Sequence, residues 1–141
     1  MIREATLEDT VQIASLMKHL SYPVSEERMK TRLEKILTHK DYQTFVYEQD
    51  QQLIGLSGMM KCFRYESDDS YVRVTTMVVD ENYRQQGIGT AMIQHIEKWA
   101  RDQGLAMITL NSGNREERKQ AHQFYIQRGF EPKATGFYKK L

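Results

Sequence analysis

The chain has 141 residues, enough for one domain with a hydrophobic core and too short for two domains of ordinary size. Twenty basic and nineteen acidic residues leave a formal net charge of +1, so no overall field favours nucleic acid or an anionic membrane. The sequence has no window of 18 apolar residues and no apolar leader, so we expect neither a membrane span nor secretion. It has a single cysteine, Cys62, which excludes an internal disulfide. We therefore expect one cytoplasmic domain over residues 1–141.

The first half of the chain predicts a short strand, two helices and two longer strands. Thr6 and Asp9 have the spacing of a capping box at the start of the first helix. Pro23 ends that helix, and Ser25 is placed to cap the second. The expected segments are Ile2–Ala5, Thr6–Leu20, Ser25–Leu37, Thr44–Glu48 and Leu53–Phe63, the last two joined by the polar turn Gln49–Gln52.

The second half predicts four strands and two helices. Gly104 and Gly129 stand where the C-terminal caps of the two helices belong. The expected segments are the strand Tyr71–Val79, the helix Ile88–Trp99, the strand Leu105–Leu110, a helix from about Glu116 to Arg128, and the closing strands Phe130–Lys133 and Thr135–Leu141. The element order is therefore β-α-α-β-β-β-α-β-α-β-β, a mixed α/β (α+β) domain with a central sheet of six to seven strands and four helices.

The residues Arg84–Gly89, RQQGIG, lie where the central strand turns into a helix. A helix N-terminus leaves about four N–H groups unpaired and carries roughly half a positive charge, and glycines allow a phosphate to approach them. The turn thus indicates pyrophosphate binding, with a ligand-free tight connection as the alternative. No lysine follows Gly89, as a Walker loop requires, and Met92 occupies the place of the third glycine of a dinucleotide fingerprint.

The same residues resemble the acetyl-CoA signature of the GCN5-related N-acetyltransferase (GNAT) superfamily, Arg/Gln-x-x-Gly-x-Gly/Ala. The preceding residues Val78–Tyr83 are similar to that family's lead sequence, and Ala121–Phe130 resembles its downstream Ala-x-x-Phe/Leu-Tyr-x-x-x-Gly-Phe motif. The resemblance spans nearly the whole chain and implies a GNAT fold. Within the superfamily, the chain looks most like small-molecule enzymes of the aminoalkylphosphonate type.

The resemblance implies that acetyl-CoA is the co-substrate and that backbone groups bind it. Amides of the turn would hold the pyrophosphate, and the end of the central strand would hydrogen-bond the pantetheine arm. A backbone N–H there would stabilise the developing oxyanion. The implied cofactor-binding residues are Met77, Val78, Val79, Arg84, Gln85, Gln86, Gly87, Ile88, Gly89, Thr90 and Arg118.

Tyr125 matches the family's general acid, which protonates the departing thiolate. A thiol has a pKa of about 8.5 and a phenol of about 10, so this transfer is uphill by about 2 kcal/mol. The alternative is a tyrosine that only packs its ring. Arg118, His122 and Tyr125 share one helical stripe, although the family more often has asparagine at the position of Arg118.

The general base is open. Glu66, Asp68 and Asp69 either act through water or form a solvated loop, and Asn111 cannot accept a proton. An alkylamine with a pKa near 10 is about 0.1% neutral at pH 7, so the amine needs help to lose its proton. Cys62 lies in an apolar strand pattern that favours packing over nucleophilic catalysis. The four histidines show no metal-ligand spacing, so we expect no metal site.

The sequence thus predicts an acetyl-CoA-dependent N-acetyltransferase in which a primary amine attacks the thioester directly. A non-catalytic acyl-CoA-sensing module and a protein-interaction domain are the alternatives. The acceptor is open among a small amine or aminophosphonate, an aminoglycoside-like compound, a polyamine and a protein N-terminus. Neither nucleic acid nor a membrane is expected as a partner, and a homodimer, common among members of the family, is compatible with the sequence.

Overall fold

The computed structural model describes residues 1–112 and 118–141. The chain divides into two compact units, Met1–Thr109 and Leu110–Leu141. The expectation that residues 1–141 form one domain stays a prediction. None of the helices within the described ranges combines the length and the apolar surface needed to cross a bilayer.

The sheet has five strands in the order β1-β2-β3-β4-β5. Neighbours among the first four strands are antiparallel. The pairs β2–β3 and β3–β4 are hairpins, whereas β1 is joined to β2 through α1 and α2, and β5 follows β4 through the helix α3, the connection typical of a parallel pair. The strands are β1 (Ile2–Glu4), β2 (Tyr42–Gln49), β3 (Gln52–Phe63), β4 (Ser70–Val79) and β5 (Ile108–Leu110). The mixed α/β class is confirmed, and β5 is shorter than the predicted Leu105–Leu110.

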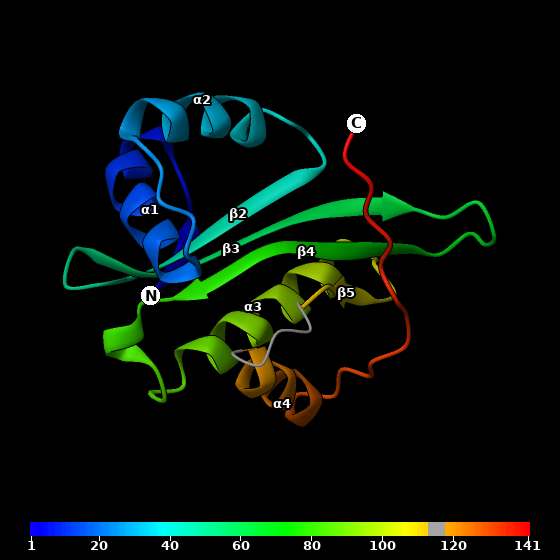
Figure 1. Ribbon diagram of the computed structural model, residues 1–141. Helices are drawn as coiled ribbons and strands as arrows, with labels where there is room; N and C mark the ends of the chain where they lie inside the picture. Colours follow the sequence, from blue (N-terminus) through cyan, green and yellow to red (C-terminus); the bar gives the residue numbers. More distant parts are fainter. Residues whose placement is uncertain (113–117) are drawn as a thin grey trace. The chain divides into compact units, whose positions relative to one another are not determined.

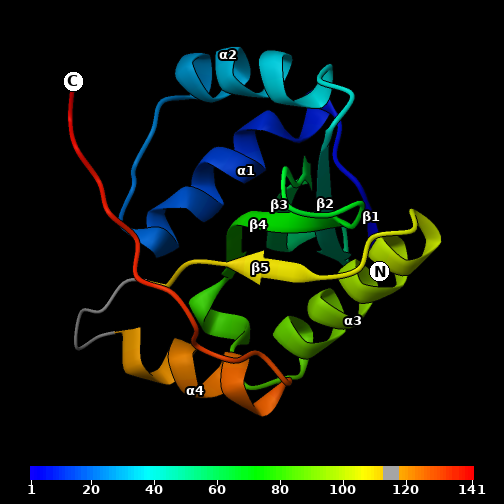
Figure 2. The same cartoon turned by 90° about the vertical axis from the view of Figure 1, so that its right-hand side faces the viewer.

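The described residues form four α-helices, as predicted. They are α1 (Thr10–Met17), α2 (Glu26–Leu37), α3 (Ile88–Asp102) and α4 (Lys119–Gln127), with single 3-10 turns at η1 (Leu7–Asp9), η2 (Lys18–Leu20) and η3 (Glu81–Tyr83). Figures 1 and 2 show α1 and α2 on one face of the sheet and α3 on the other. The first unit is therefore a three-layer arrangement in which the sheet is covered on both faces.

Each face of the sheet has its own apolar cluster. Ile13 and Leu16 of α1 and Leu33 of α2 pack on one face, against sheet residues that include Val46 and Val78. On the other face, Ile54 packs with Ile88 and Met92 of α3. A Cβ at Gly55 would lie 2.8 Å from the sulfur of Met92, so the missing side chain there allows α3 to approach β3 closely.

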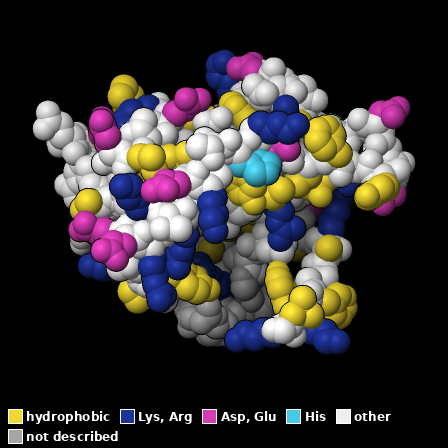
Figure 3. Space-filling view, turned by 90° about the horizontal axis from the view of Figure 1, so that it is seen from above, with side chains coloured by type: hydrophobic (Ala, Val, Ile, Leu, Met, Phe, Trp, Pro, Cys, Tyr) yellow, Lys and Arg dark blue, Asp and Glu magenta, His cyan; other side chains and the backbone are white. Residues whose placement is uncertain are grey.

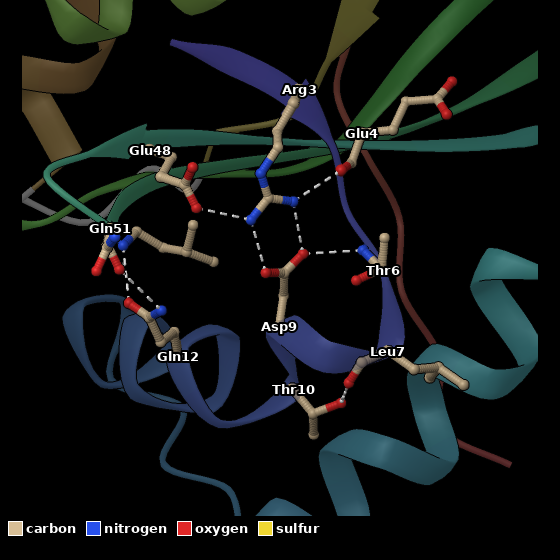
Figure 4. Close-up of polar contacts among 10 residues, drawn as sticks. Arg3, Glu4, Thr6, Leu7, Asp9, Thr10, Gln12, Glu48 and Gln51 are labelled. Atoms are coloured by element: carbon tan, nitrogen blue, oxygen red, sulfur yellow. Dashed lines mark hydrogen bonds and ion pairs between the residues drawn. The ribbon is translucent and has the colours of Figure 1, made fainter.

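The guanidinium of Arg3 ties β1 to α1 and β2 (Figure 4). It donates to both carboxylate oxygens of Asp9, at 2.8 and 2.9 Å, and to Glu48 Oε1 at 2.9 Å. Asp9 also accepts the N–H of Thr6 at 2.9 Å, which confirms the predicted pairing of these two residues at the helix start. The bond from Arg3 lowers the pKa of the buried Asp9 carboxyl, against the opposing effect of desolvation.

The turn between β2 and β3 lies at the predicted place. Asp50 and Gln51 both adopt left-handed backbone conformations, with φ of 52° and 64°. Gln12 of α1 holds this turn, because its amide donates to the carbonyl of Gln51 at 3.5 Å and accepts the N–H of Leu53 at 2.8 Å (Figure 4). The helix therefore fixes the register of the hairpin at its closed end.

The closing strands predicted for Phe130–Lys133 and Thr135–Leu141 are absent, since the described residues after α4 contain no regular element. Gly129 ends α4 with φ of 91°, as predicted, and the N–H of Phe130 returns to the carbonyl of Tyr125 at 3.1 Å. Apolar alternation predicts which side chains share a face, but a strand exists only when an edge pairs with it. The predicted start of the last helix, Glu116, lies outside the described residues.

Candidate functional site

The connection between β4 and α3 is a tightly ordered turn. Asp80, which is buried, caps η3 by accepting the N–H of Asn82 at 2.9 Å, and its own N–H donates to the carbonyl of Ile54 at 2.8 Å. Gln85 follows with φ of 63° and Gly87 with φ of 81°, after which α3 begins at Ile88. Two left-handed residues in three reverse the chain sharply, so the first turn of α3 starts beside the end of β4.

The space beside Gly87 is open. A Cβ built there would have no described atom within 4 Å, so neighbouring groups do not require glycine at this position, although the left-handed φ favours it. As the N-cap residue, Gly87 supplies no side chain to accept the first-turn amides, and that turn holds no acidic residue. The positive end of a 15-residue helix without an acidic residue in its first turn fits a diphosphate.

The end of β4 presents backbone groups at one edge. Because Asp80 N–H bonds to β3, strand alternation directs the N–H and C=O groups of Met77 and Val79 away from β3. The bonds that join β4 to the chain before β5 lie at its other end, from Val72 N–H to Met107 O and from Ala106 N–H to Ser70 O, both 2.9 Å. The edge at Met77 and Val79 is thus suited to an extended partner, as predicted for a pantetheine arm.

A bulge separates the two ends of β4. The register steps from Gly58↔Thr76 to Met59↔Val74, which leaves Thr75 as the extra residue. The hydroxyl of Thr75 donates to the carbonyl of Gly58 at 3.1 Å. The side chains near the predicted pantetheine edge pack inward, Val78 toward the α1–α2 cluster and Met77 and Val79 toward the α3 cluster. The role of the backbone of these three residues in holding a pantetheine arm stays a prediction.

The structure adds one residue that the sequence did not single out. His19 of η2 lies with Nε2 3.7 Å from Asp80 Oδ1, and its Nδ1 accepts the N–H of Glu81 at 3.5 Å. This histidine links the α1–α2 connection to the β4–α3 turn. A single histidine between two helices carries no recognisable spacing, so no sequence signal identified it.

The second unit carries the predicted acid. The ring of Tyr125 packs against Phe124 and Phe130, with centroids 5.4 and 5.7 Å apart. Burial raises the pKa of Tyr125 above its ordinary value of 10.0, and the positive charge of Arg118 opposes that rise. The phenol is therefore protonated at neutral pH and has a proton to donate. Arg118 is the N-cap residue of α4 rather than part of a helical stripe.

The carboxylates considered as a base lie at the opposite end of β4. Glu66, Asp68 and Asp69 are exposed in the connection before Ser70, about 25 Å of extended strand from Met77. This placement favours the solvated-loop interpretation. The Sγ of Cys62 lies 3.9 Å from the carbonyl of Met60 within β3, which favours a packing role for the thiol.

Comparison with known families decides the classification. The model of the acetyltransferase (GNAT) family matches residues 7–130. The chain belongs to this family. The prediction of an N-acetyltransferase, an enzyme of the acyltransferase class, is confirmed at that level, and the GNAT fold is confirmed with five strands.

Individual relatives agree with this classification. The chain is 25% identical to YhdJ of Bacillus subtilis, described as an uncharacterized N-acetyltransferase, over 86% of this chain and 83% of YhdJ. It is also 25% identical to an amino-acid acetyltransferase of Pseudomonas fluorescens, over 96% of this chain but 28% of that protein.

Solved structures extend the likeness to the fold. A GNAT family acetyltransferase from Staphylococcus aureus aligns with a TM-score of 0.87 at 30% identity, covering 100% of this chain and 98% of that one. An aminoglycoside N-acetyltransferase, AAC(6')-Iy, solved in complex with CoA, aligns with a TM-score of 0.86 at 19% identity over 99% of this chain and 93% of its own. At that identity the second likeness concerns the fold alone.

Proposed function

We propose that this GNAT enzyme transfers an acetyl group from acetyl-CoA to a small primary amine by direct attack of the amine on the thioester. The observation that carries the proposal is the start of α3, where Gly87 leaves open space beside first-turn amides that meet neither a capping side chain at the N-cap nor an acidic residue. The family match and the fold shared with a CoA-bound acetyltransferase support the same ligand.

Acetyl-CoA, when bound, supplies the acetyl group as an activated thioester. In the proposal, amides from Gln85 to Thr90 bind its pyrophosphate and Arg84 adds positive charge beside them. The edge of β4 at Met77 and Val79, with Val78 between them, orients the extended arm through backbone hydrogen bonds. An N–H of that edge also polarises the thioester oxygen, a role for which backbone donors are well suited because their positions are already fixed.

Tyr125 is the proposed general acid. Its raised pKa keeps the phenol protonated at neutral pH, so the proton needed by the departing sulfur is available. Arg118 is proposed to lie near a phosphate group of the co-substrate, and its charge moderates the pKa of Tyr125. The base is proposed to be a water chain, since the acidic residues of the β3–β4 connection lie at the far end of β4.

The acceptor is proposed to be a small amine, with aminophosphonates as one class among the candidates. The decisive experiment is a thiol-release assay with acetyl-CoA across simple alkylamines, aminophosphonates, polyamines and aminoglycosides. Release that depends on one amine class, together with acetylated product in the mass spectrum, supports the proposal. Release by none of them, while acetyl-CoA still raises the Tm, points instead to an acyl-CoA-sensing module.

The sensing module is the second candidate function and shares the same binding turn. It predicts that acetyl-CoA binding changes the protein without product formation. Tyr125→Phe separates the two functions, because an enzyme loses turnover at unchanged acetyl-CoA affinity, whereas a sensor loses nothing. If millimolar acetyl-CoA leaves the Tm unchanged, both functions are wrong and the glycines are architectural.

A further inference from the structure

The approach of the acceptor follows from what covers each face of the sheet beside the proposed thioester. Within Met1–Thr109, Met77 and Val79 pack toward α3, so that face is filled at the end of β4. On the other face, Val78 packs into the α1–α2 cluster. The next residue of β4 on that face is Thr76, which is only partly buried. The open approach to the edge at Met77 therefore runs over the sheet surface that begins at Thr76.

A row of three side chains crosses the sheet on this face. The register pairs Met60 of β3 with Tyr42 of β2 and with Arg73 of β4. Because side chains alternate along a strand, Met60 shares the face of Leu56, a member of the α1–α2 cluster, and its partners in register lie on the same face. Arg73 is exposed, while Met60 and Tyr42 are partly buried. We call this row, together with Thr76, the acceptor surface.

Neighbouring contacts confirm which face the row occupies. Lys61, the next residue of β3, lies on the α3 side, because its Nζ is 3.5 Å from Oε1 of Gln103 at the end of α3. His39, in the connection from α2 to β2, packs edge-on against Tyr42 with ring centroids 5.0 Å apart. The acceptor surface is therefore on the α1–α2 side of the sheet. Figure 1 shows the β3–β4 hairpin extending past the two helices on that side.

The acceptor surface carries positive charge. Apart from Arg73, the described residues that the register places beside the row on this face are uncharged: Thr44, Gly58, Cys62 and Tyr71. Arg64 adds a second guanidinium, stacked on Tyr71 at 4.4 Å from the ring centroid. Glu66, Asp68 and Asp69 follow in the connection between the strands, and the view onto this face shows acidic side chains at the outer end of the hairpin (Figure 3). The surface therefore favours an anionic group.

On the basis of the proposed acetyl transfer, we infer that the acceptor is an amine that also carries an acidic group, either a carboxylate or a phosphonate. Arg73 holds this group while the amine faces the thioester. A guanidinium suits the task because it binds a carboxylate or a phosphonate through two parallel N–H···O bonds. Met60 and Tyr42 provide apolar surface for the spacer between the acceptor's two ends.

The distances along β4 fit a short spacer. Met77 and Arg73 are four residues apart, which is about 13 Å of extended strand before the bulge at Thr75 shortens it. The spacer of the acceptor and the long side chain of Arg73 divide this span between them. A polyamine or an aminoglycoside would instead place a second positive charge against Arg73, which is unfavourable.

The acidic group takes no part in the bond changes. The nitrogen of the acceptor forms a bond to the acetyl carbon as the carbon–sulfur bond breaks. The acceptor's ammonium group loses two protons in total, one of which is gained by the sulfur of CoA and one by the solvent. Arg73 is therefore a specificity-determining residue, and its loss should act on KM rather than on kcat.

Matched acceptors test the inference with the wild type. Amino alcohols, ω-amino acids and ω-aminoalkylphosphonates are compared at equal spacer length by thiol release. An acidic acceptor should show a kcat/KM about tenfold or more above that of the matched alcohol, and a polyamine should be poorer than both. The carboxylate and phosphonate arms identify the acid. Equal or better turnover of the alcohol would overturn the inference and leave the proposed function intact, whereas no release with any amine would overturn the function itself.

Two variants locate the effect at Arg73. Arg73→Gln should raise KM for the acidic acceptor about tenfold while KM for the matched alcohol stays unchanged. Arg73→Glu should reverse the preference, so that a diamine becomes a better substrate than the amino acid. The control Arg32→Gln removes an exposed guanidinium from α2 and should change neither KM.

An unchanged Kd of acetyl-CoA and an unchanged circular dichroism spectrum verify that the Arg73 variants are intact. Equal losses with the acidic acceptor and the alcohol would indicate a structural role for Arg73 and overturn the inference. An unchanged preference in Arg73→Glu would overturn it as well. Neither result would affect the proposed acetyl transfer, since both require turnover to be observed.

Discussion

The two compact units of the chain differ in how their order is maintained. Met1–Thr109 holds a sheet with an apolar cluster on each face, and side chains such as Ile13, Ile54 and Ile96 are wholly buried. Among the described residues of Leu110–Leu141 no side chain is fully buried. The apolar contacts of this unit include those of the Tyr125 ring with the rings of Phe124 and Phe130. The first unit is therefore rigid by its own packing, while the second depends on fewer local contacts.

This difference assigns the two tasks of the proposed enzyme to different parts of the chain. Binding relies on backbone groups at β4 and α3, whose positions the core of the first unit fixes in advance. Proton donation relies on one side chain of the second unit. Affinity for acetyl-CoA and turnover should therefore respond to different substitutions, and the following changes test that separation.

The largest effect is expected for Tyr125→Phe. Loss of the hydroxyl removes the proton donor, so kcat should fall about 100-fold or more, while the Kd of acetyl-CoA stays unchanged. Stopped-flow thiol release and calorimetric titration measure the two quantities. Tyr42→Phe, on β2, removes a hydroxyl outside the proposed site and serves as the control.

The pH profile of the wild type checks the same role. A general acid must be protonated, and burial raises the pKa of Tyr125 above its ordinary value of 10.0, so deprotonation of this group should not limit the activity between pH 7 and 9. Between pH 7 and 10 the rate should rise as the amine substrate loses its proton. An alkaline decline below pH 9 that persists in Tyr125→Phe would show that another group limits the rate.

The next effect concerns the stability of the first unit. Asp9→Asn removes one of the two charged partners of Arg3 and should lower the free energy of unfolding by about 2 kcal/mol at pH 7. Because Arg3 lowers the pKa of Asp9 in the folded protein, its stabilisation is present above the ordinary value of 3.8 and is lost as pH falls below it. When the pH is lowered from 7 to 3, the free energy of unfolding measured in urea should thus fall less in the variant than in the wild type.

A surface ion pair provides the contrast for Asp9. Asp102→Asn removes an exposed i,i+4 partner of Lys98, 2.9 Å away, and should change the free energy of unfolding by less than about 0.5 kcal/mol. Equal losses in the two variants would mean that the connection of β1, α1 and β2 through Arg3 adds nothing beyond an ordinary salt bridge.

A third effect is expected at the turn. Gly87→Val fills the open space at the start of α3 and should raise the Kd of acetyl-CoA about tenfold, equivalent to 1.4 kcal/mol. Gly104→Val is the matched control, since Gly104 has φ of 75°, open space for a Cβ and a place at the other end of the same helix. Both variants should lose stability, but only the first should lose affinity. If the two variants bind acetyl-CoA with equal Kd values, the proposed pyrophosphate site is wrong.

The smallest effect is expected for His19→Ala. Its loss frees the N–H of Glu81 and loosens the β4–α3 turn, so the Kd of acetyl-CoA should rise about threefold, in keeping with one weak neutral hydrogen bond. His39→Ala removes a similar bond, from Asp41 N–H to Nδ1 at 3.1 Å, in the α2–β2 connection. Calorimetry should show no change in affinity for that control.

Local signals predicted most of the first unit. Ser25 caps α2 through the N–H of Arg28 at 3.2 Å, and Gly104 ends α3 in the left-handed conformation, as their positions in the sequence indicated. Such signals act within a few residues, so a single sequence contains them. The glycine turn was predicted for the same reason, because its conformation is set by local backbone geometry.

Features that depend on distant partners were not predictable. The closing strands were wrong because alternation in Thr135–Leu141 says nothing about which edge pairs with it. The contact of His19 with Asp80 joins residues far apart in the chain, and the sequence around one residue gives no indication of the other. The cofactor contacts and the role of Tyr125 stay predictions, since they concern groups that only a bound co-substrate would bring together.

The β2–β3 hairpin offers a point for engineering greater heat resistance. Asp50 and Gln51 both hold the left-handed geometry of a type I′ loop, which the pair Asn-Gly adopts with less strain. Because Gln12 engages this loop through the backbone of Gln51 and Leu53, the exchange keeps that anchor. The double substitution should raise the Tm without touching the chemistry, which would make the protein a sturdier scaffold for acceptor redesign.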